Sequence, residues 1–226
     1  MINKLKRHLN GIKSGGFHYF IGVLKELWPH RFLGTGRVVL VAKESFNIET
    51  PAEGEYRARL ATLDDLDILG DFGRVFDRKR CEYQLKRGDA CVIIFKGDKP
   101  VMMGWGATGK LFCRSNAAIL DTGNNGYYVY GGYTIREERK RGLANLGEMT
   151  LVRYYASQDR NIIYVLIDPK NTASITMHKN HGFETLGYSR FFWVFGILIC
   201  TYKYWPETSV KMRIFLKRPP DGYDWV

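Results

Sequence analysis

Cysteine is scarce in this chain of 226 residues, and its four cysteines form no C-x-x-C pair. A disulfide framework is therefore not expected, and a reducing cytosol is the simplest compartment. Of the five histidines, only His178 and His181 lie close together, and no cysteine or carboxylate stands beside them at a usual ligand spacing. We therefore predict no metal site.

Long apolar runs are also missing. The longest, Phe191 to Cys200, is far shorter than the roughly 20 residues of a membrane-spanning helix, and its aromatic and β-branched residues favour a buried strand. The basic start of the chain is not followed by an apolar segment with a cleavage site, so we predict no signal peptide. With 45% hydrophobic residues, the chain can form one cytoplasmic domain, alone or with an appendage.

Acidic residues are nearly absent from residues 1–36, where Glu26 stands alone against six lysines and arginines. We interpret 1–36 as a basic amphipathic segment and 37–226 as the main domain. The segment either rests on an anionic membrane, at its inner surface, or is a helical appendage packed on the domain or on a partner chain. Glycines at 15, 16 and 22 interrupt a long helix and favour the appendage. A homodimer is left open.

The remaining pattern predicts a mixed α/β sheet. We expect strands at 37–46, 55–61, 127–135, 161–169, 191–202 and 209–216, a hairpin at 89–108, and helices after Thr62, from 76 to Gly88, at 143–156 and at 171–180.

The stretch REERKRGLANLGE, residues 136–148, follows a predicted strand and opens a predicted helix. Free N–H groups at a helix N-terminus bind anions, and Gly142 and Ala144 leave the backbone accessible. Arg139, Lys140 and Arg141 add positive charge, so a diphosphate is the natural ligand. The alternative is a solvated basic loop. The stretch is neither a P-loop nor a dinucleotide fingerprint, because the required lysine and glycines are missing.

The spacing Arg139-x-x-Gly142-x-Ala144 resembles the pyrophosphate signature of the GNAT superfamily of acetyl-coenzyme A-dependent acyltransferases. A second signature of that family is similar to Asn171, Ser174, His178 and Gly182-Phe183. The resemblance covers roughly residues 55–217. It implies a mostly antiparallel central sheet flanked by helices, and transfer of an acetyl group from acetyl-coenzyme A to a primary amine by direct attack on the thioester.

The resemblance also implies roles for individual residues. The strand before the loop is expected to carry a bulge at 130–133 and to diverge from its neighbour, so that the pantetheine arm can pair with it. The expected cofactor-binding residues are Tyr133, Thr134, Ile135, Arg139, Lys140, Arg141, Gly142, Leu143, Ala144, Asn145, Asn171, Ser174 and Phe183.

The chain departs from the family at His178, where members often have a tyrosine that protonates the leaving thiolate. His178 either replaces this acid, binds substrate or is a bystander, and Tyr133 and Tyr188 are alternative donors. No general base stands out. Glu137 and Glu138 are expected to be solvated and Glu82 and Asp121 structural. Tyrosines 127, 128 and 130 are candidates to line the acceptor side; the alternative for about half of them is the core, because side chains of a strand alternate between its faces.

Other functions stay open in the sequence. One is a coenzyme A-binding module that has lost catalysis, because the usual tyrosine is replaced. Another is a nucleic-acid binder, suggested by the net charge of +11; the spread of the cations and the lack of a recognised motif argue against it. A small amine is the favoured acceptor, but the sequence does not identify it.

Overall fold

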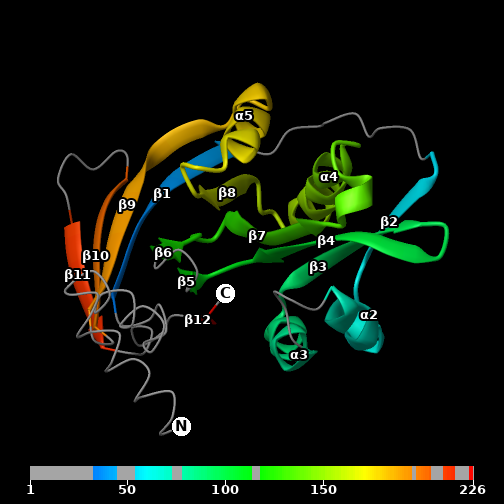
Figure 1. The fold of residues 1–226 in the computed structure, drawn as a ribbon, viewed down its shortest axis with the longest axis horizontal. Helices are drawn as coiled ribbons and strands as arrows, with labels where there is room; N and C mark the ends of the chain where they lie inside the picture. The colour runs from blue at the N-terminus through cyan, green and yellow to red at the C-terminus, as the bar shows by residue number, and fades with distance from the viewer. Residues whose placement is uncertain are drawn as a thin grey trace, which may run out of the picture.

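The computed structural model describes residues 33–44, 54–72, 78–113, 118–194, 197–204, 211–216 and 224–225; side chains are described for Lys43, for 119–190 and for most of 54–113. Residues 1–32, most of the basic amphipathic segment predicted at 1–36, lie outside these ranges. Among the described residues, one sheet has nine strands in the order β11-β10-β9-β1-β8-β7-β4-β3-β2, and a smaller sheet has the order β12-β5-β6 (Figure 1).

The strands are mostly antiparallel, as predicted; within the large sheet, β7 and β8 form a parallel pair. Their bounds are β1 Leu33–Glu44, β2 Tyr56–Leu60, β3 Ala90–Lys96, β4 Lys99–Ala107, β5 Lys110–Cys113, β6 Ala118–Asp121, β7 Gly126–Thr134, β8 Ile162–Ile167, β9 Glu184–Val194, β10 Ile197–Tyr204, β11 Lys211–Leu216 and β12 Asp224–Trp225.

Helices cover both faces of the large sheet (Figure 1). Helices α4 (Leu143–Ala156) and α5 (Thr172–Asn180) lie on one face, which we call the α4 face. The 3-10 helix η1 (Leu63–Asp65), α2 (Leu66–Asp71) and α3 (Arg78–Arg87) lie on the other, the α3 face. A second 3-10 helix, η2 (Arg136–Glu138), follows β7.

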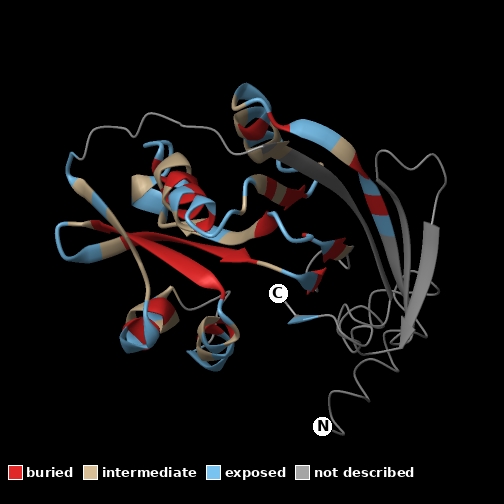
Figure 2. Ribbon diagram, turned by 180° about the vertical axis from the view of Figure 1, so that it is seen from behind, coloured by how far each residue is buried: buried red, intermediate tan, exposed pale blue. Residues whose placement is uncertain are grey.

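The central strands β3 and β4 are buried along most of their length (Figure 2). Their side chains contribute to two cores, one on each face of the sheet. On β3, Val92 and Ile94 join the core beneath α4, whereas Ile93 joins the core beneath α2 and α3. This follows from the two-residue period of a strand, and it explains why β3 is apolar along nearly its whole length.

Strand β1 enters the sheet between β8 and β9, far from the other early elements (Figure 1). It pairs with β8 from Val39 to Glu44 and with β9 along most of its length. It begins at Leu33, so the predicted boundary at residue 36 falls inside a strand. The local pattern predicts a strand at 37–46 but gives no indication of its neighbours, because strand pairing is a long-range property.

One predicted strand is wrong in detail, and two stretches of strand were not predicted. The apolar run expected as one strand at 191–202 is divided between the end of β9 and the start of β10, which pair antiparallel from Val194 and Ile197. The β5–β6 hairpin was not predicted, and nor were residues 184–190 of β9. The helices at 143–156 and 171–180 agree closely with α4 and α5.

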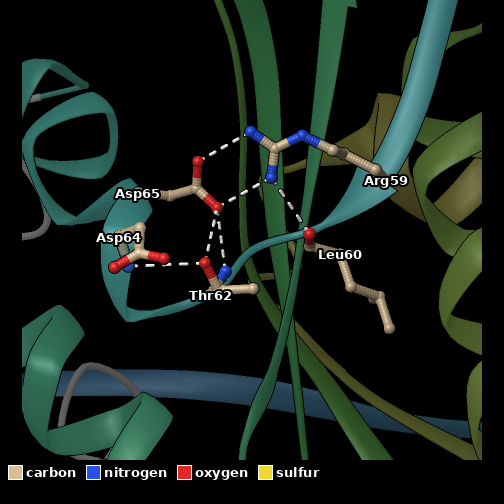
Figure 3. Close-up of polar contacts among 5 residues, drawn as sticks. All are labelled: Arg59, Leu60, Thr62, Asp64 and Asp65. Carbon is tan, nitrogen blue, oxygen red and sulfur yellow. Dashed lines mark hydrogen bonds and ion pairs between the residues drawn. The ribbon is translucent and has the colours of Figure 1, made fainter.

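Thr62 caps the turn that leads from β2 into η1 and α2, as predicted (Figure 3). Its hydroxyl accepts from the N–H of Asp64, and its own N–H donates to Asp65 Oδ2 at 2.8 Å. Asp65 also accepts two parallel bonds from Arg59, at 2.6 and 2.7 Å, so its buried carboxylate is held between β2 and the helix start. The Asp65 carboxylate therefore fixes the position at which η1 and α2 start after β2.

Candidate functional site

Strands β7 and β8 pair along only part of their length and then diverge. They pair from Gly126–Val129 to Ile162–Val165. Further along, in the described strands, β7 pairs only with β4 and β8 only with β1. We call this divergence the fork. It leaves backbone groups of 130–134 without a sheet partner on one side. An extended ligand can pair with a strand only where such groups are available.

A bulge bends β7 just beyond the fork. Trp105 and Met103 of β4 are two residues apart, yet they pair with Tyr130 and Tyr133, which are three apart. The extra residue falls at Gly131-Gly132, and Gly131 has a φ of 61°, which favours glycine. The bulge predicted at 130–133 is therefore confirmed, and it turns the last residues of β7 away from β8.

The segment 136–142, which we call the anion loop, leads from β7 to the N-terminus of α4. Gly142 is the N-cap residue with a φ of 74°, and Lys140 is also left-handed, with a φ of 64°. The first intrahelical bond is donated by Leu146 to the Gly142 carbonyl, so the N–H groups of the preceding helical residues have no acceptor within α4. A Cβ on Gly142 would meet no atom within 4 Å, so the approach to these N–H groups is open.

The charges around the anion loop fit a diphosphate. Arg139, Lys140 and Arg141 are exposed beside free helix N–H groups, which together form a positive site. Arg139 Nε donates to the Thr134 carbonyl at 3.1 Å, which fixes its side chain between β7 and the loop. The Oδ1 atom of Asn145, in the first turn of α4, is buried and has no partner among the described residues.

Glu138 holds the anion loop against the edge of the sheet, and the prediction that it is solvated is wrong. Its side chain is 12% exposed. It accepts from the Tyr56 hydroxyl at 2.6 Å, from Lys96 at 3.2 Å, and lies 3.2 Å from Arg141 Nε. The Tyr56 hydrogen bond, together with the one from Lys96, lowers the pKa of Glu138. Glu137, by contrast, is exposed as predicted.

Asn171 is the N-cap residue of α5, and its Oδ1 accepts from Ser174 N at 3.2 Å. The amide nitrogen of the same side chain is left to serve as a donor. Asn171 follows the end of β8, so it lies on the β8 side of the fork while the anion loop lies on the β7 side. Phe183 packs in the same core as Val129 and Val165, the last paired residues of the two strands.

His178 lies edge-on to Phe183, with ring centroids 4.7 Å apart, and is 5% exposed. Its Nδ1 is 2.7 Å from the Ser174 carbonyl oxygen, which can only accept, so Nδ1 carries the hydrogen in the neutral ring. The other nitrogen, Nε2, lies 3.9 Å from a carboxylate oxygen of Glu148 on α4. Burial lowers the pKa of His178. The sequence did not single out Glu148.

Two of the predicted candidates for proton transfer lie on opposite faces of the sheet. His178 belongs to the α4 face, whereas Tyr133 packs with Phe72 and Met103 in the core of the α3 face, its ring edge-on to that of Phe72 at 6.1 Å. The third candidate, Tyr188, is exposed on β9. The structure therefore does not bring these three side chains together.

Tyrosines 127, 128 and 130 divide between the faces, as strand alternation requires. Tyr127 is buried beneath α4 and stacks on Tyr155. Tyr128 and Tyr130 stack on each other on the α3 face, and Tyr130 donates to Asp89, a buried carboxylate paired with Arg87. Asp89 was missed, because nothing in the local sequence separates it from an ordinary loop aspartate after Gly88.

The remaining base candidates have structural partners. Glu82 pairs with Lys86 one helical turn away on α3, and Asp121 accepts from the N–H of Gly123 in the turn before β7. In the described part of the chain, no cluster of histidine, cysteine and carboxylate side chains could hold a metal, and no helix is long and apolar enough to cross a membrane.

No family model and no curated protein matches this sequence, but solved structures do. An acetyltransferase of the GNAT family from Novosphingobium aromaticivorans is 13% identical and matches 72% of this chain and 66% of its own, with a TM-score of 0.50. A GNAT-family acetyltransferase from Colwellia psychrerythraea, 12% identical, matches 69% of this chain and 54% of its own, also at 0.50. This chain has the GNAT fold.

A Drosophila protein is similar at the same level: it is 14% identical, matches 76% of this chain and 56% of its own, and has a TM-score of 0.51. The chain thus spans between 54% and 66% of the length of these three structures. Identities this low establish the GNAT fold alone. The fold that the two sequence signatures predicted is confirmed.

Proposed function

We propose that this chain is an N-acyltransferase that moves an acetyl group from acetyl-coenzyme A to a primary amine. The observation that carries the proposal is the joint arrangement of the fork and the anion loop. An opened strand edge that ends at a bare, positively charged helix N-terminus suits a ligand with an amide-containing arm and a diphosphate. The pantetheine arm and the diphosphate of coenzyme A have this composition.

Backbone groups of Tyr133 and Thr134 would pair with the pantetheine arm, and Asn171 Nδ2 would donate to it from the opposite side of the fork. Ile135 is not available in the same way, because its N–H donates to the Val101 carbonyl and its own carbonyl accepts from Glu138 N. The N–H groups from Lys140 to Asn145 would hold the diphosphate. The enzyme would then act by positioning the thioester for direct attack by the amine. The N–C bond forms, the C–S bond breaks with its electron pair on sulfur, the amine loses a proton to water, and the thiolate takes up a proton in exchange to leave as a thiol.

The first test is a thermal melt of the full chain with acetyl-coenzyme A or coenzyme A. Ligand at about one hundred times its Kd adds about 2.7 kcal/mol, a rise of roughly 5 to 11 °C for a domain of this size. Gly142→Glu should abolish the rise, because it strains a left-handed position and places a negative charge at the anion site. Gly109→Glu is the matched control, since Gly109 is also left-handed and open but lies between β4 and β5.

The second test is release of free thiol from acetyl-coenzyme A with a panel of primary amines that includes amino sugars, polyamines and peptides. Turnover that is lost in Gly142→Glu supports the proposal. Binding of coenzyme A without turnover by any amine would instead identify a coenzyme A-binding module without catalysis. Absence of any melting shift at millimolar cofactor would refute both.

A further inference from the structure

A group of ionisable side chains lies on the α4 face beside the fork, and all but the partly exposed Lys43 are buried. Lys43 of β1 is the neighbour of Ile163 of β8, and Ile163 is the neighbour of Tyr127 of β7. Directly paired residues of neighbouring strands point to the same face, so Lys43 and Tyr127 both face α4 and α5. The side chain of Glu148 points from α4 toward Lys43 and Tyr127, and the side chain of His178 on α5 lies beside Glu148.

The Glu148 carboxylate is shielded from solvent, and the positive charge of Lys43 lies near it. The Glu148 side chain is 8% exposed. Burial raises its pKa to about 7, although the charge of Lys43 acts in the opposite direction. Lys43 donates to the His181 carbonyl, and burial lowers its pKa. The Tyr127 hydroxyl is buried without a partner among the described residues, and burial and then Glu148 raise its pKa.

The surroundings of Glu148 and His178 determine which of the two carries a proton near neutral pH. As the pH falls through neutrality, Glu148 takes up a proton before His178 does, because burial raises the pKa of a carboxyl and lowers that of an imidazole. The His178 ring is then neutral, with Nδ1–H donated to the Ser174 carbonyl and the lone pair of Nε2 facing the Glu148 carboxyl. A carboxylic acid therefore faces a base across 3.9 Å.

We propose that Glu148 is a positioning residue of the acyl-transfer site, where its carboxyl stores the proton that His178 passes to the departing sulfur. This proposal rests on the function proposed above. His178 lies beside Phe183, which packs with Val129 and Val165 at the fork. Rotation of the carboxyl closes the gap to Nε2, and the resulting carboxylate stabilises the imidazolium that forms.

The step balances. The amine nitrogen bonds to the acyl carbon, and the C–S bond breaks with its electron pair on sulfur. Nε2 takes the proton of Glu148 and gives it to the sulfur, so the products are an amide and a free thiol. The proton that the amine loses goes to water, from which Glu148 is protonated again. No oxidant, metal or additional reactant is required.

The role can be measured without turnover, by an NMR pH titration of the wild-type full chain with ¹³C-labelled histidine rings. The His178 resonance is assigned by its loss in His178→Gln. The His178 resonance should shift with a midpoint near pH 7, the pKa of Glu148. This step should vanish in Glu148→Gln, which keeps a hydrogen-bond donor but has no transferable proton. It should persist in Glu184→Gln, an exposed carboxyl on β9. A wild-type resonance without this step overturns the proposal.

Kinetics then separate a positioning role from a merely structural one. With the best amine of the panel, Glu148→Gln should lower kcat about 100-fold, the lower range for a lost proton donor. Its KM for acetyl-coenzyme A should be unchanged, and the wild-type fall of kcat above about pH 7 should disappear. An unchanged kcat and pH profile in Glu148→Gln would overturn the proposal. Failure of the wild-type chain to bind coenzyme A would instead overturn the proposed function, whatever the titration shows.

Discussion

The hydroxyl of Tyr56 donates to Glu138 Oε2 at 2.6 Å and joins the edge strand of the sheet to the anion loop, 82 residues later in the chain. Lys96 of β3 reaches the other oxygen of the same carboxylate, and Arg141 of the loop lies against it. A glutamate inside a basic loop would weaken anion binding if it were free. Here the Glu138 carboxylate is held by Tyr56, Lys96 and Arg141, which leaves Arg139 and Lys140 to face an anion.

Tyr56→Phe should therefore weaken coenzyme A binding without unfolding the chain. Removing the hydroxyl releases Glu138 from β2, and a loop that is less ordered before binding has to be ordered by the ligand. We expect Kd to rise on the order of tenfold. Titration calorimetry with coenzyme A measures the change. Tyr83→Phe, which removes the hydroxyl of an exposed tyrosine on α3, is the control. Equal affinities in all three proteins would show that the bond does not position the loop.

Gly106→Ala should destabilise the fold. A Cβ at this position would lie 2.4 Å from Cε2 of Tyr155, a buried ring stacked on Tyr127 with a centroid distance of 4.3 Å. Overpacking of this kind costs about 1 to 3 kcal/mol, which urea unfolding would measure. Gly104→Ala is the matched control on the same strand, because its nearest atoms would be 3.5 Å away, at ordinary contact distance. If the two variants lost the same stability, close packing of α4 on β4 would not be the reason for Gly106.

The parts of the site that are encoded by neighbouring residues could be predicted from sequence. Gly142 and Ala144 at a strand–helix junction predict the anion loop, and the Gly-Gly pair predicts the bulge. Asn171 was predicted to bind the pantetheine arm, which the structure does not test; it was found instead to cap α5.

What could not be predicted depends on contacts between distant segments. The position of β1 and the tie between Tyr56 and Glu138 are examples, because nothing in either segment specifies the other. Glu148 did carry a signal that was overlooked. It is four residues before Val152 and seven before Tyr155, both buried, so it falls on the apolar stripe of α4, where a charged residue is unusual.

Asp65→Asn should destabilise the turn from β2 into α2 by about 2 kcal/mol, because it removes charged hydrogen bonds to Arg59. The bonds from Arg59 lower the pKa of Asp65. A lowered carboxyl pKa gives stability that is present above the unfolded pKa and is lost as the pH falls. The difference between the two proteins should therefore shrink in acid. Asp64→Asn, at the exposed neighbour, should leave urea unfolding unchanged; a constant difference at every pH would contradict the role of the charge.

Glu148→Gln should stabilise the chain at pH 8 and have little effect at pH 5. The pKa of Glu148 is about 7 in the folded protein against a reference value of 4.5, so the folded state binds the proton more tightly than the unfolded state does. Its contribution is fully present below pH 4.5 and is lost as the pH rises to about 7. A difference of 2.5 pKa units corresponds to about 3 kcal/mol, so glutamine, which never ionises, should recover up to this amount in base.

Urea unfolding of both proteins at pH 5, 6, 7 and 8 measures this curve. His178 acts in the opposite sense, because its lowered pKa gives stability above pH 6.5 that is lost in acid. Subtracting the two curves leaves the effect of Glu148 together with that of its contact with His178. Glu184→Gln should give a flat difference, since its carboxyl is exposed. If Glu148→Gln also gave a flat difference, its carboxyl would be ionised throughout this range and could not store a proton at neutral pH.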